Sequence, residues 1–350
     1  MAKLLGVLWP AFVRPQPGEL LSSWLVRLAH AHSLKVHTFC SITWPGVNVW
    51  NRDIDRLAPA KILTTLATRT PTPPERVWDT TLASYAGRLH IRANPRGNAD
   101  WILPLGIYHR TRARYGLLFC PQCLQKDDQK PYFRKEWRLA FSIVCTKCGL
   151  YLHDRCPHCG QPVMFFRQEL GRKSSLPDAP ISICFRCNFD LAGSVCYPAP
   201  TLLLNRQAEW YRILAEGWNP EVIYPHLYFE ALRQVAKALF SPRLFGSAWQ
   251  REIAERSGSD SMAAIWHARP AQAAVEFWPL AVRSTVLQQA HWLLEDWPTR
   301  FVDVMKRHRI ASTPLLRDRV CSPYWYESVV RNNLFVNNIN RRFSNFGFSA

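Results

Sequence analysis

Residues 119–163 read FCPQCLQKDDQKPYFRKEWRLAFSIVCTKCGLYLHDRCPHCGQPV, and this stretch contains three of the chain's four Cys-x-x-Cys pairs. The fourth pair follows in the sequence CFRC at residues 184–187. A Cys-x-x-Cys turn places two thiolates on one side of a tight backbone reversal, and two such turns supply the four sulfur ligands that structural Zn²⁺ favours. The sequence therefore predicts two zinc ions, bound by Cys120, Cys123, Cys145, Cys148, Cys156, Cys159, Cys184 and Cys187.

The longer gaps, 21 residues between the first and second pairs and 24 residues between the third and fourth, are typical of zinc ribbons. We favour consecutive pairing, in which the first two pairs form one site and the last two form the other, because it requires only local loop closure. Cross-braced pairing, which joins the first pair to the third and the second to the fourth, is the alternative. Eight cysteines fill two tetrahedra without His153 or His158, and a shell of four sulfurs leaves no position for water. We therefore expect structural zinc and not catalytic zinc.

Disulfides and redox-active dithiols are the other interpretations of the cysteine pairs. The first 21 residues are broken by three prolines and lack a cleavage-like site. We therefore expect a cytoplasmic protein whose thiols stay reduced. No run approaches 18 uncharged apolar residues, so we expect neither a transmembrane helix nor a membrane partner.

The chain is strongly basic, with 44 Lys and Arg against 26 Asp and Glu and a formal net charge of +18. A surplus of this size favours a polyanionic partner such as DNA, although a generally basic solvated surface would have the same composition. Basic residues are concentrated between residues 86 and 150, where Trp101 and Tyr115 lie among them and offer packing or stacking surface. The candidate phosphate contacts are Arg88, Arg92, Arg96, Arg110, Arg112 and Arg114.

The length of 350 residues and the hydrophobic content of 48% are sufficient for two or three folded domains. Apolar residues recur at helical spacing in residues 19–31, and short helices joined by tight turns resemble a helix-turn-helix unit. A helical packing module without a ligand is the alternative. We predict a mainly α-helical chain with a helix-turn-helix-like domain at residues 1–115, tandem four-cysteine zinc ribbons at 116–200, and a C-terminal helical domain at 201–350.

Smaller elements follow from the same patterns. Short strands are expected at residues 115–119, 139–144 and 181–183, around the cysteine pairs. The C-terminal domain ends in a basic tail that is rich in asparagine and aromatic residues.

Motifs of the common enzyme classes are absent from the sequence: there is no Walker A motif, no GxGxxG after a strand and no GxSxG elbow. Acidic residues are sparse, and the pairs Asp53/Asp55 and Asp127/Asp128 do not by themselves form a metal-dependent nuclease site. We therefore expect that the protein is not an enzyme.

Two segments of the chain resemble the TniQ/TnsD family. Residues 14–34, RPQPGELLSSWLVRLAHAHSL, are similar to the N-terminal motif of that family, and residues 119–163 are similar to its zinc signature. One position departs from the family pattern, because Cys148 stands where the family usually has histidine. A thiolate is an equally good zinc ligand, so this departure changes the charge of the site and not the expected fold.

The resemblance implies a non-catalytic protein that selects the target site of a bacterial transposon. Such a protein binds target DNA, in the nucleoid, and recruits an AAA+ ATPase regulator that engages the transposase. The alternative is an adaptor bound to an RNA-guided CRISPR effector complex, which bridges that complex to the ATPase without reading DNA itself. Family members of the second kind can form homodimers.

The proline-rich segment of residues 10–17 is a candidate docking site for the ATPase. Prolines restrict the backbone to extended conformations, and an extended segment with exposed apolar side chains can dock on a partner. The candidate contacts are Trp9, Phe12 and Val13. In the alternative interpretation these side chains pack back onto the first helix.

Overall fold

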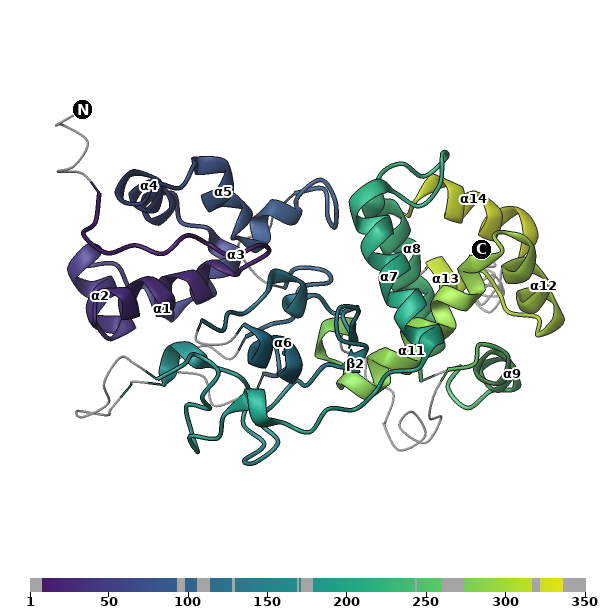
Figure 1. Cartoon of the computed structure of the whole chain (residues 1–350). Helices are drawn as coiled ribbons and strands as arrows, with labels where there is room; N and C mark the ends of the chain where they lie inside the picture. Colours follow the sequence, from purple (N-terminus) through teal and green to yellow (C-terminus); the bar gives the residue numbers. More distant parts are fainter. Residues whose placement is uncertain are drawn as a thin grey trace, which may run out of the picture. The chain divides into compact units, whose positions relative to one another are not determined.

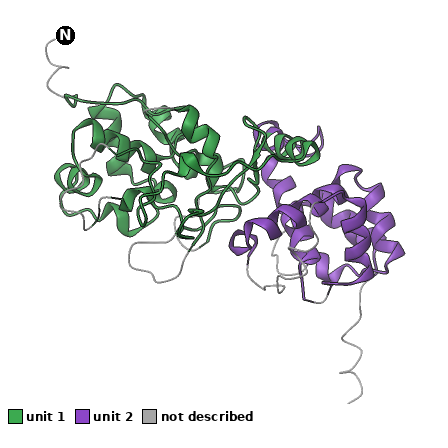
Figure 2. Cartoon of the chain, turned by 60° about the horizontal axis from the view of Figure 1, so that its bottom comes forward, with its two compact units in different colours: residues 1–211 green, residues 212–350 purple. Residues whose placement is uncertain are grey.

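The computed structural model shows a mainly helical chain, as the sequence predicts. It falls into two compact units, residues 1–211 and residues 212–350 (Figure 2). The predicted N-terminal domain and the predicted metal module both lie in the first unit. The residues that the structure describes are 8–92, 98–105, 114–127, 130–168, 170, 179–242, 244–259, 274–316 and 322–335.

Five short helices form the N-terminal part of unit 1 (Figure 1). The apolar stripe predicted for the first of them is real, because Trp24 and Leu28 are fully buried. This helix begins at Leu21, two residues later than the periodicity suggests, because the backbone of Leu20 is still extended (φ −69°, ψ 142°) and its N–H donates to the Phe133 carbonyl (2.9 Å). The helices are α1 (Leu21–Ala31), α2 (Val36–Thr43), α3 (Ile54–Leu57), α4 (Ala60–Arg69) and α5 (Pro74–Asp79).

The cysteine-rich part of unit 1 has little regular structure. It contains helix α6 (Pro121–Lys126) and an antiparallel hairpin of β1 (Val144–Cys145) and β2 (Leu150–Tyr151). The strands predicted at 115–119 and 181–183 are reduced to single bridges, Phe119 with His153 and Ile183 with Asp190. Turns that hold cysteines together replace the longer ladders that the apolar runs suggest.

Helix α7 (Thr201–Glu216) starts in unit 1 and packs on the cysteine-rich part. The side-chain carbonyl of Gln207 accepts the Ile143 N–H (2.8 Å), and the hydroxyls of Ser142 and Tyr211 lie 2.9 Å apart. Unit 1 therefore extends beyond residue 200 into the first helix of the predicted C-terminal domain.

Unit 2 is a separate helical core. Its two long helices α8 and α11 pack against each other, and the Tyr228 hydroxyl on α8 lies 2.7 Å from Nδ1 of His291 on α11. None of the helices among the described residues combines the length and the apolar composition that a membrane span requires. Among the described residues, the helices that lie wholly in unit 2 are α8 (Pro225–Leu239), α9 (Ala248–Arg256), α11 (Leu280–Glu295), α12 (Thr299–Arg307), α13 (Thr313–Leu316) and α14 (Tyr324–Asn333).

Candidate metal centres

Eight cysteines form two clusters in unit 1. The first contains Cys120, Cys123, Cys145 and Cys148, and the second contains Cys156, Cys159, Cys184 and Cys187. Within each cluster all four sulfur atoms lie within 4.8 Å of one another. The structure thus groups the cysteines consecutively and not in the cross-braced arrangement, and each group can hold one metal ion.

The distances between sulfur atoms fit a tetrahedral metal site. In the first cluster, Sγ of Cys123 lies 3.5 Å from Sγ of Cys145 and 3.5 Å from Sγ of Cys148. In the second cluster, two sulfur pairs are 3.7 Å apart. A tetrahedron with metal–sulfur bonds of about 2.3 Å has sulfur–sulfur edges of about 3.8 Å, whereas a disulfide bond measures about 2.0 Å.

Tight turns after the cysteines build both clusters. Cys148 and Gly149 each donate a backbone N–H to the Cys145 carbonyl (3.3 and 2.8 Å), and Gly160 donates to the Cys156 carbonyl (2.9 Å). Both glycines have a φ of +70°, in the left-handed region that glycine adopts without steric cost. Each turn therefore directs its two thiols to the same side of the backbone.

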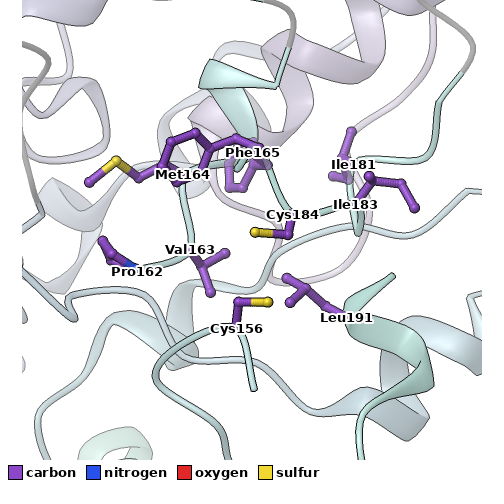
Figure 3. A pocket seen from close by; sticks show the side chains of 10 residues that line it. Cys156, Pro162, Val163, Met164, Phe165, Ile181, Ile183, Cys184 and Leu191 are labelled. Carbon is purple, nitrogen blue, oxygen red and sulfur yellow. The ribbon is translucent and has the colours of Figure 1, made fainter. Parts of the chain in front are cut away.

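The second cluster has an inner and an outer half. Cys156 and Cys184 are buried, whereas Cys159 and Cys187 are half-exposed. Figure 3 shows the two inner cysteines surrounded by apolar side chains, among them Val163. This environment excludes water from the inner sulfurs, which is typical of a structural metal site.

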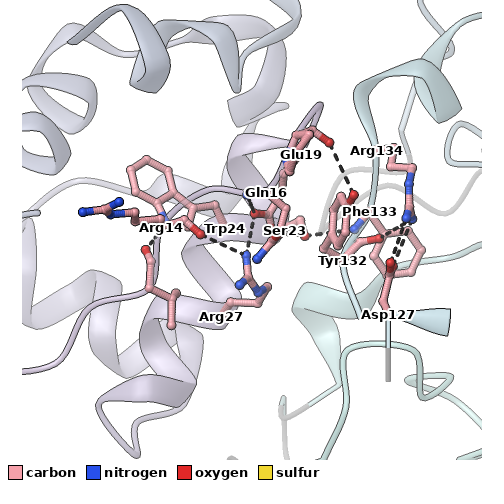
Figure 4. A network of polar contacts seen from close by, with 12 residues as sticks. Arg14, Gln16, Glu19, Ser23, Trp24, Arg27, Asp127, Tyr132, Phe133 and Arg134 are labelled. Atoms are coloured by element: carbon pink, nitrogen blue, oxygen red, sulfur yellow. Dashed lines mark hydrogen bonds and ion pairs between the residues drawn. The ribbon is translucent and has the colours of Figure 1, made fainter. Parts of the chain in front are cut away.

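The segment between the first two cysteine pairs holds the N-terminal helices (Figure 4). Ser23 on α1 accepts the Phe133 N–H (3.0 Å) and donates its hydroxyl to Glu19 (2.8 Å). Glu19 forms a buried ion pair with Arg27 (2.6 Å). Burial raises the pKa of Glu19, and Arg27 opposes that rise.

The next residues of the segment continue this contact. Arg134 forms two hydrogen bonds with the Asp127 carboxylate (3.1 and 2.9 Å), so Asp127 is engaged in a structural pair. Lys135 donates its backbone N–H to the Gly18 carbonyl (2.8 Å) and pairs with Asp79 on α5 (2.7 Å). Burial lowers the pKa of Lys135, and Asp79 opposes that change.

Arg138 is the most buried cation of the network. Its side chain is fully buried and pairs with Asp53 (2.6 Å) and Asp55 (3.2 Å), and it also donates to the Leu103 carbonyl (2.8 Å). Asp55 further accepts the backbone N–H (2.8 Å) and the hydroxyl (2.9 Å) of Ser22. Burial, followed by the charge of Asp53, raises the pKa of Asp55 to about 6, against the lowering effect of Arg138.

This buried ion-pair network is not predicted from the sequence. Asp53 and Asp55 are the only acidic residues between residues 20 and 74, but their spacing does not indicate that they are buried. Their partner, Arg138, is more than eighty residues away, and no local pattern connects them. The segment that closes the first metal cluster is therefore also the support of α1, α3 and α5.

The arginines predicted to contact phosphate are only partly described. Arg88 and Arg92 are exposed, and Arg114 is half-buried. Arg96, Arg110 and Arg112 lie outside the described residues. Of the packing or stacking surface expected from the aromatic residues between these arginines, Trp101 supplies packing. Its ring is only 1% exposed and packs against Phe141, with ring centroids 5.7 Å apart.

The segment predicted to dock on a partner is partly buried: Trp9 and Val13 are half-buried, whereas Phe12 is exposed. Trp9 is half-buried, and its ring contacts those of His32 (5.8 Å) and Phe39 (5.3 Å). The carbonyl of Val13, which is also half-buried, accepts the Trp24 indole N–H (2.7 Å). Phe12 is 42% exposed. The expected exposure is therefore wrong for Trp9, whose ring packs back on the helices, and Val13 is only partly exposed.

Comparison with known protein families identifies the N-terminal part of the chain. The TniQ family model matches residues 10–152. The match covers helices α1 to α6, the hairpin, all four cysteines of the first cluster and the network around Arg138. The second cluster begins at Cys156, beyond the match, and no curated protein matches the chain. Residues 10–152 are therefore a TniQ domain.

Proposed function

We propose that this protein is a target-selection factor of a transposon, which binds target DNA and recruits an AAA+ ATPase regulator. The observation that carries the proposal is the TniQ match over residues 10–152, which includes the complete first metal cluster. The match covers the part of unit 1 in which the cysteines, the buried ion pairs and the N-terminal helices form one packed structure.

Two structural zinc ions complete this proposal. Zinc is the metal that best suits four thiolates in a tetrahedron, and the sulfur separations of 3.5 to 3.7 Å agree with its bond length. A shell of four cysteines leaves no open position for water. Zinc would stabilise the folded state of each site through its bonds to the four sulfur atoms.

The same geometry favours a role without catalysis. The acidic pairs that could have been metal-dependent nuclease sites are used otherwise: Asp53 and Asp55 are engaged by Arg138, and Asp127 by Arg134. A carboxylate held by a buried arginine is not free to bind a divalent cation. We therefore propose that the protein acts by binding and positioning other molecules.

The net charge of +18 supports DNA as one partner, since neutralisation of phosphates dominates such binding. For the ATPase we retain the N-terminal segment and place the contact at Phe12, because Phe12 is exposed whereas Trp9 and Val13 are half-buried.

A three-component capture experiment tests the proposal. Biotinylated target DNA is mixed with the transposon's own ATPase, with or without the zinc-loaded protein. We expect the ATPase to be retained on DNA only when the protein is present. Equal retention without it would refute the proposal. Retention that requires a guide-RNA complex in addition would favour the adaptor role.

A further inference from the structure

Helix α12 in unit 2 ends in a basic turn that lies far along the chain from the arginines predicted to contact phosphate. Residues 306–309 read Lys-Arg-His-Arg, and the lysine and both arginines are exposed. We propose that this basic turn binds the phosphate backbone of duplex DNA through Lys306 and Arg309. The inference rests on the DNA-binding role proposed above and assigns a surface of unit 2 to it.

The backbone holds Arg309 in a conformation that favours glycine. Its φ is +52°. The turn closes by two hydrogen bonds that are typical of a helix end: Ile310 N–H donates to the Met305 carbonyl (2.9 Å), and Arg309 N–H donates to the Lys306 carbonyl (3.1 Å). Glycine is the usual residue at the left-handed position of this motif, because a Cβ is unfavourable there. Helix termination therefore does not explain an arginine at residue 309.

The two middle residues of the turn, Arg307 and His308, share one carboxylate as an ion-pair partner. Glu252 on α9 pairs with Arg307 (2.5 Å) and with His308 (2.5 Å), and Arg307 also pairs with Asp303. The hydrogen bond from His308 is the main cause of a lowered pKa at Glu252. These ion pairs link the turn to α9. Lys306 and Arg309 flank the two paired residues in the sequence.

Lys306 and Arg309 take no part in these ion pairs. Among the described residues, neither has an acidic partner. The position of Lys306 in the last helical turn is also favourable for the helix dipole, but Arg309 lies beyond the helix. Two exposed cations on a turn whose backbone is already folded can neutralise two phosphates without a further cost for ordering the backbone.

The surroundings of the turn favour nucleic acid over a protein partner. The next residues, Ile310, Ala311 and Ser312, are buried, so the turn presents charge without an adjacent apolar surface. Protein interfaces usually centre on apolar or aromatic anchors, whereas DNA interfaces are strongly positive and polar.

Because residue 309 has a backbone conformation that favours glycine, one substitution can weaken DNA binding without lowering stability. Arg309→Gly removes the charge and places glycine where the backbone favours it, so the unfolding midpoint should not fall. Loss of one phosphate contact should weaken DNA binding about fivefold at about 0.15 M salt, and the slope of log K against log salt should flatten by about 0.9. Adding Lys306→Gln should bring the loss to about 30-fold and the change in slope to about 1.8.

Two controls accompany these variants of the full-length, zinc-loaded protein. Ser33 has a φ of +53° at the end of α1, where Leu34 donates to the Ala29 carbonyl (3.0 Å) and Ser33 to the His30 carbonyl (2.8 Å). Ser33→Gly therefore makes the same backbone change without changing the charge and should leave affinity unchanged. Arg309→Lys keeps the charge and should retain most of the affinity.

Fluorescence anisotropy with a labelled duplex at several salt concentrations gives both readouts. If the parent protein binds in a salt-dependent manner but the double variant binds equally well, the inference is overturned while DNA binding stands. Equal losses in Ser33→Gly and Arg309→Gly would also overturn it. If the parent protein shows no salt-dependent DNA binding, both the inference and the DNA-binding role fail.

Discussion

Replacement of Arg138 by methionine tests whether the buried ion-pair network supports unit 1. Methionine fills much of the same volume but removes the guanidinium that contacts Asp53, Asp55 and the Leu103 carbonyl. Asp55 is fully buried in the network and would keep only its hydrogen bonds from Ser22. Removal of one member of a buried pair costs about 3–5 kcal/mol, because a charge is left without compensation.

That loss would be a large fraction of the total stability of a domain, which is about 5–15 kcal/mol. Urea unfolding followed by tryptophan fluorescence measures it, with zinc content determined in parallel. Arg76→Met is the matched control, because Arg76 pairs with Asp79 at 3.8 Å and both side chains are about half exposed. An exposed pair of this kind contributes less than about 1 kcal/mol.

The double variant Arg138→Met/Asp55→Asn separates lost packing from lost charge compensation. If the unpaired carboxylate causes the loss, the uncharged amide should recover part of the stability. Equal, small losses in Arg138→Met and Arg76→Met would refute the view that this network holds the N-terminal helices on the metal module.

Three further outcomes follow from the structure. The raised pKa of Asp55 means that its contribution to stability is fully present below its unfolded pKa near 3.8 and is lost as pH rises through about 6. An NMR titration of this carboxyl should therefore show a midpoint near 6, and a midpoint below 4 would contradict the burial argument. Native mass spectrometry should find two zinc ions per chain. Cys120→Ser should remove one zinc ion and destabilise the N-terminal helices, whereas Cys187→Ser should remove the other and leave those helices folded. A parent protein without zinc would contradict both expectations. Phe12→Ser should reduce capture of the ATPase without loss of stability, while Trp78→Ser, at a similar exposure of 45%, should not; equal capture by both would place the contact elsewhere.

The sequence was most informative where contacts are local. The consecutive grouping of the cysteines follows from loop closure over short separations, and helix α1 (Leu21–Ala31) lies within residues 19–31, where the apolar residues recur at helical spacing. Local sequence also explains why α5 begins at Pro74, because a proline at the first helical position loses no hydrogen bond.

Contacts over long separations could not be predicted in this way. The pairing of Arg138 with Asp53 spans 85 residues, and nothing in the local pattern of either residue indicates burial. The sequence leaves both packing and stacking open for Trp101 for a related reason: its neighbours in sequence are basic, but its neighbours in space are apolar. The ring of Trp9 contacts that of Phe39, and the position of Phe39 depends on how α1 and α2 pack, which the sequence does not indicate.

The central claim, that this protein binds target DNA itself in the course of target selection, is tested most directly by footprinting. The purified, zinc-loaded protein is incubated alone with the DNA of its insertion locus, and protection from nuclease cleavage is mapped. We expect a protected stretch at one position, which weakens as salt rises because phosphate contacts carry much of the binding. The absence of any protected stretch at low salt would contradict the claim.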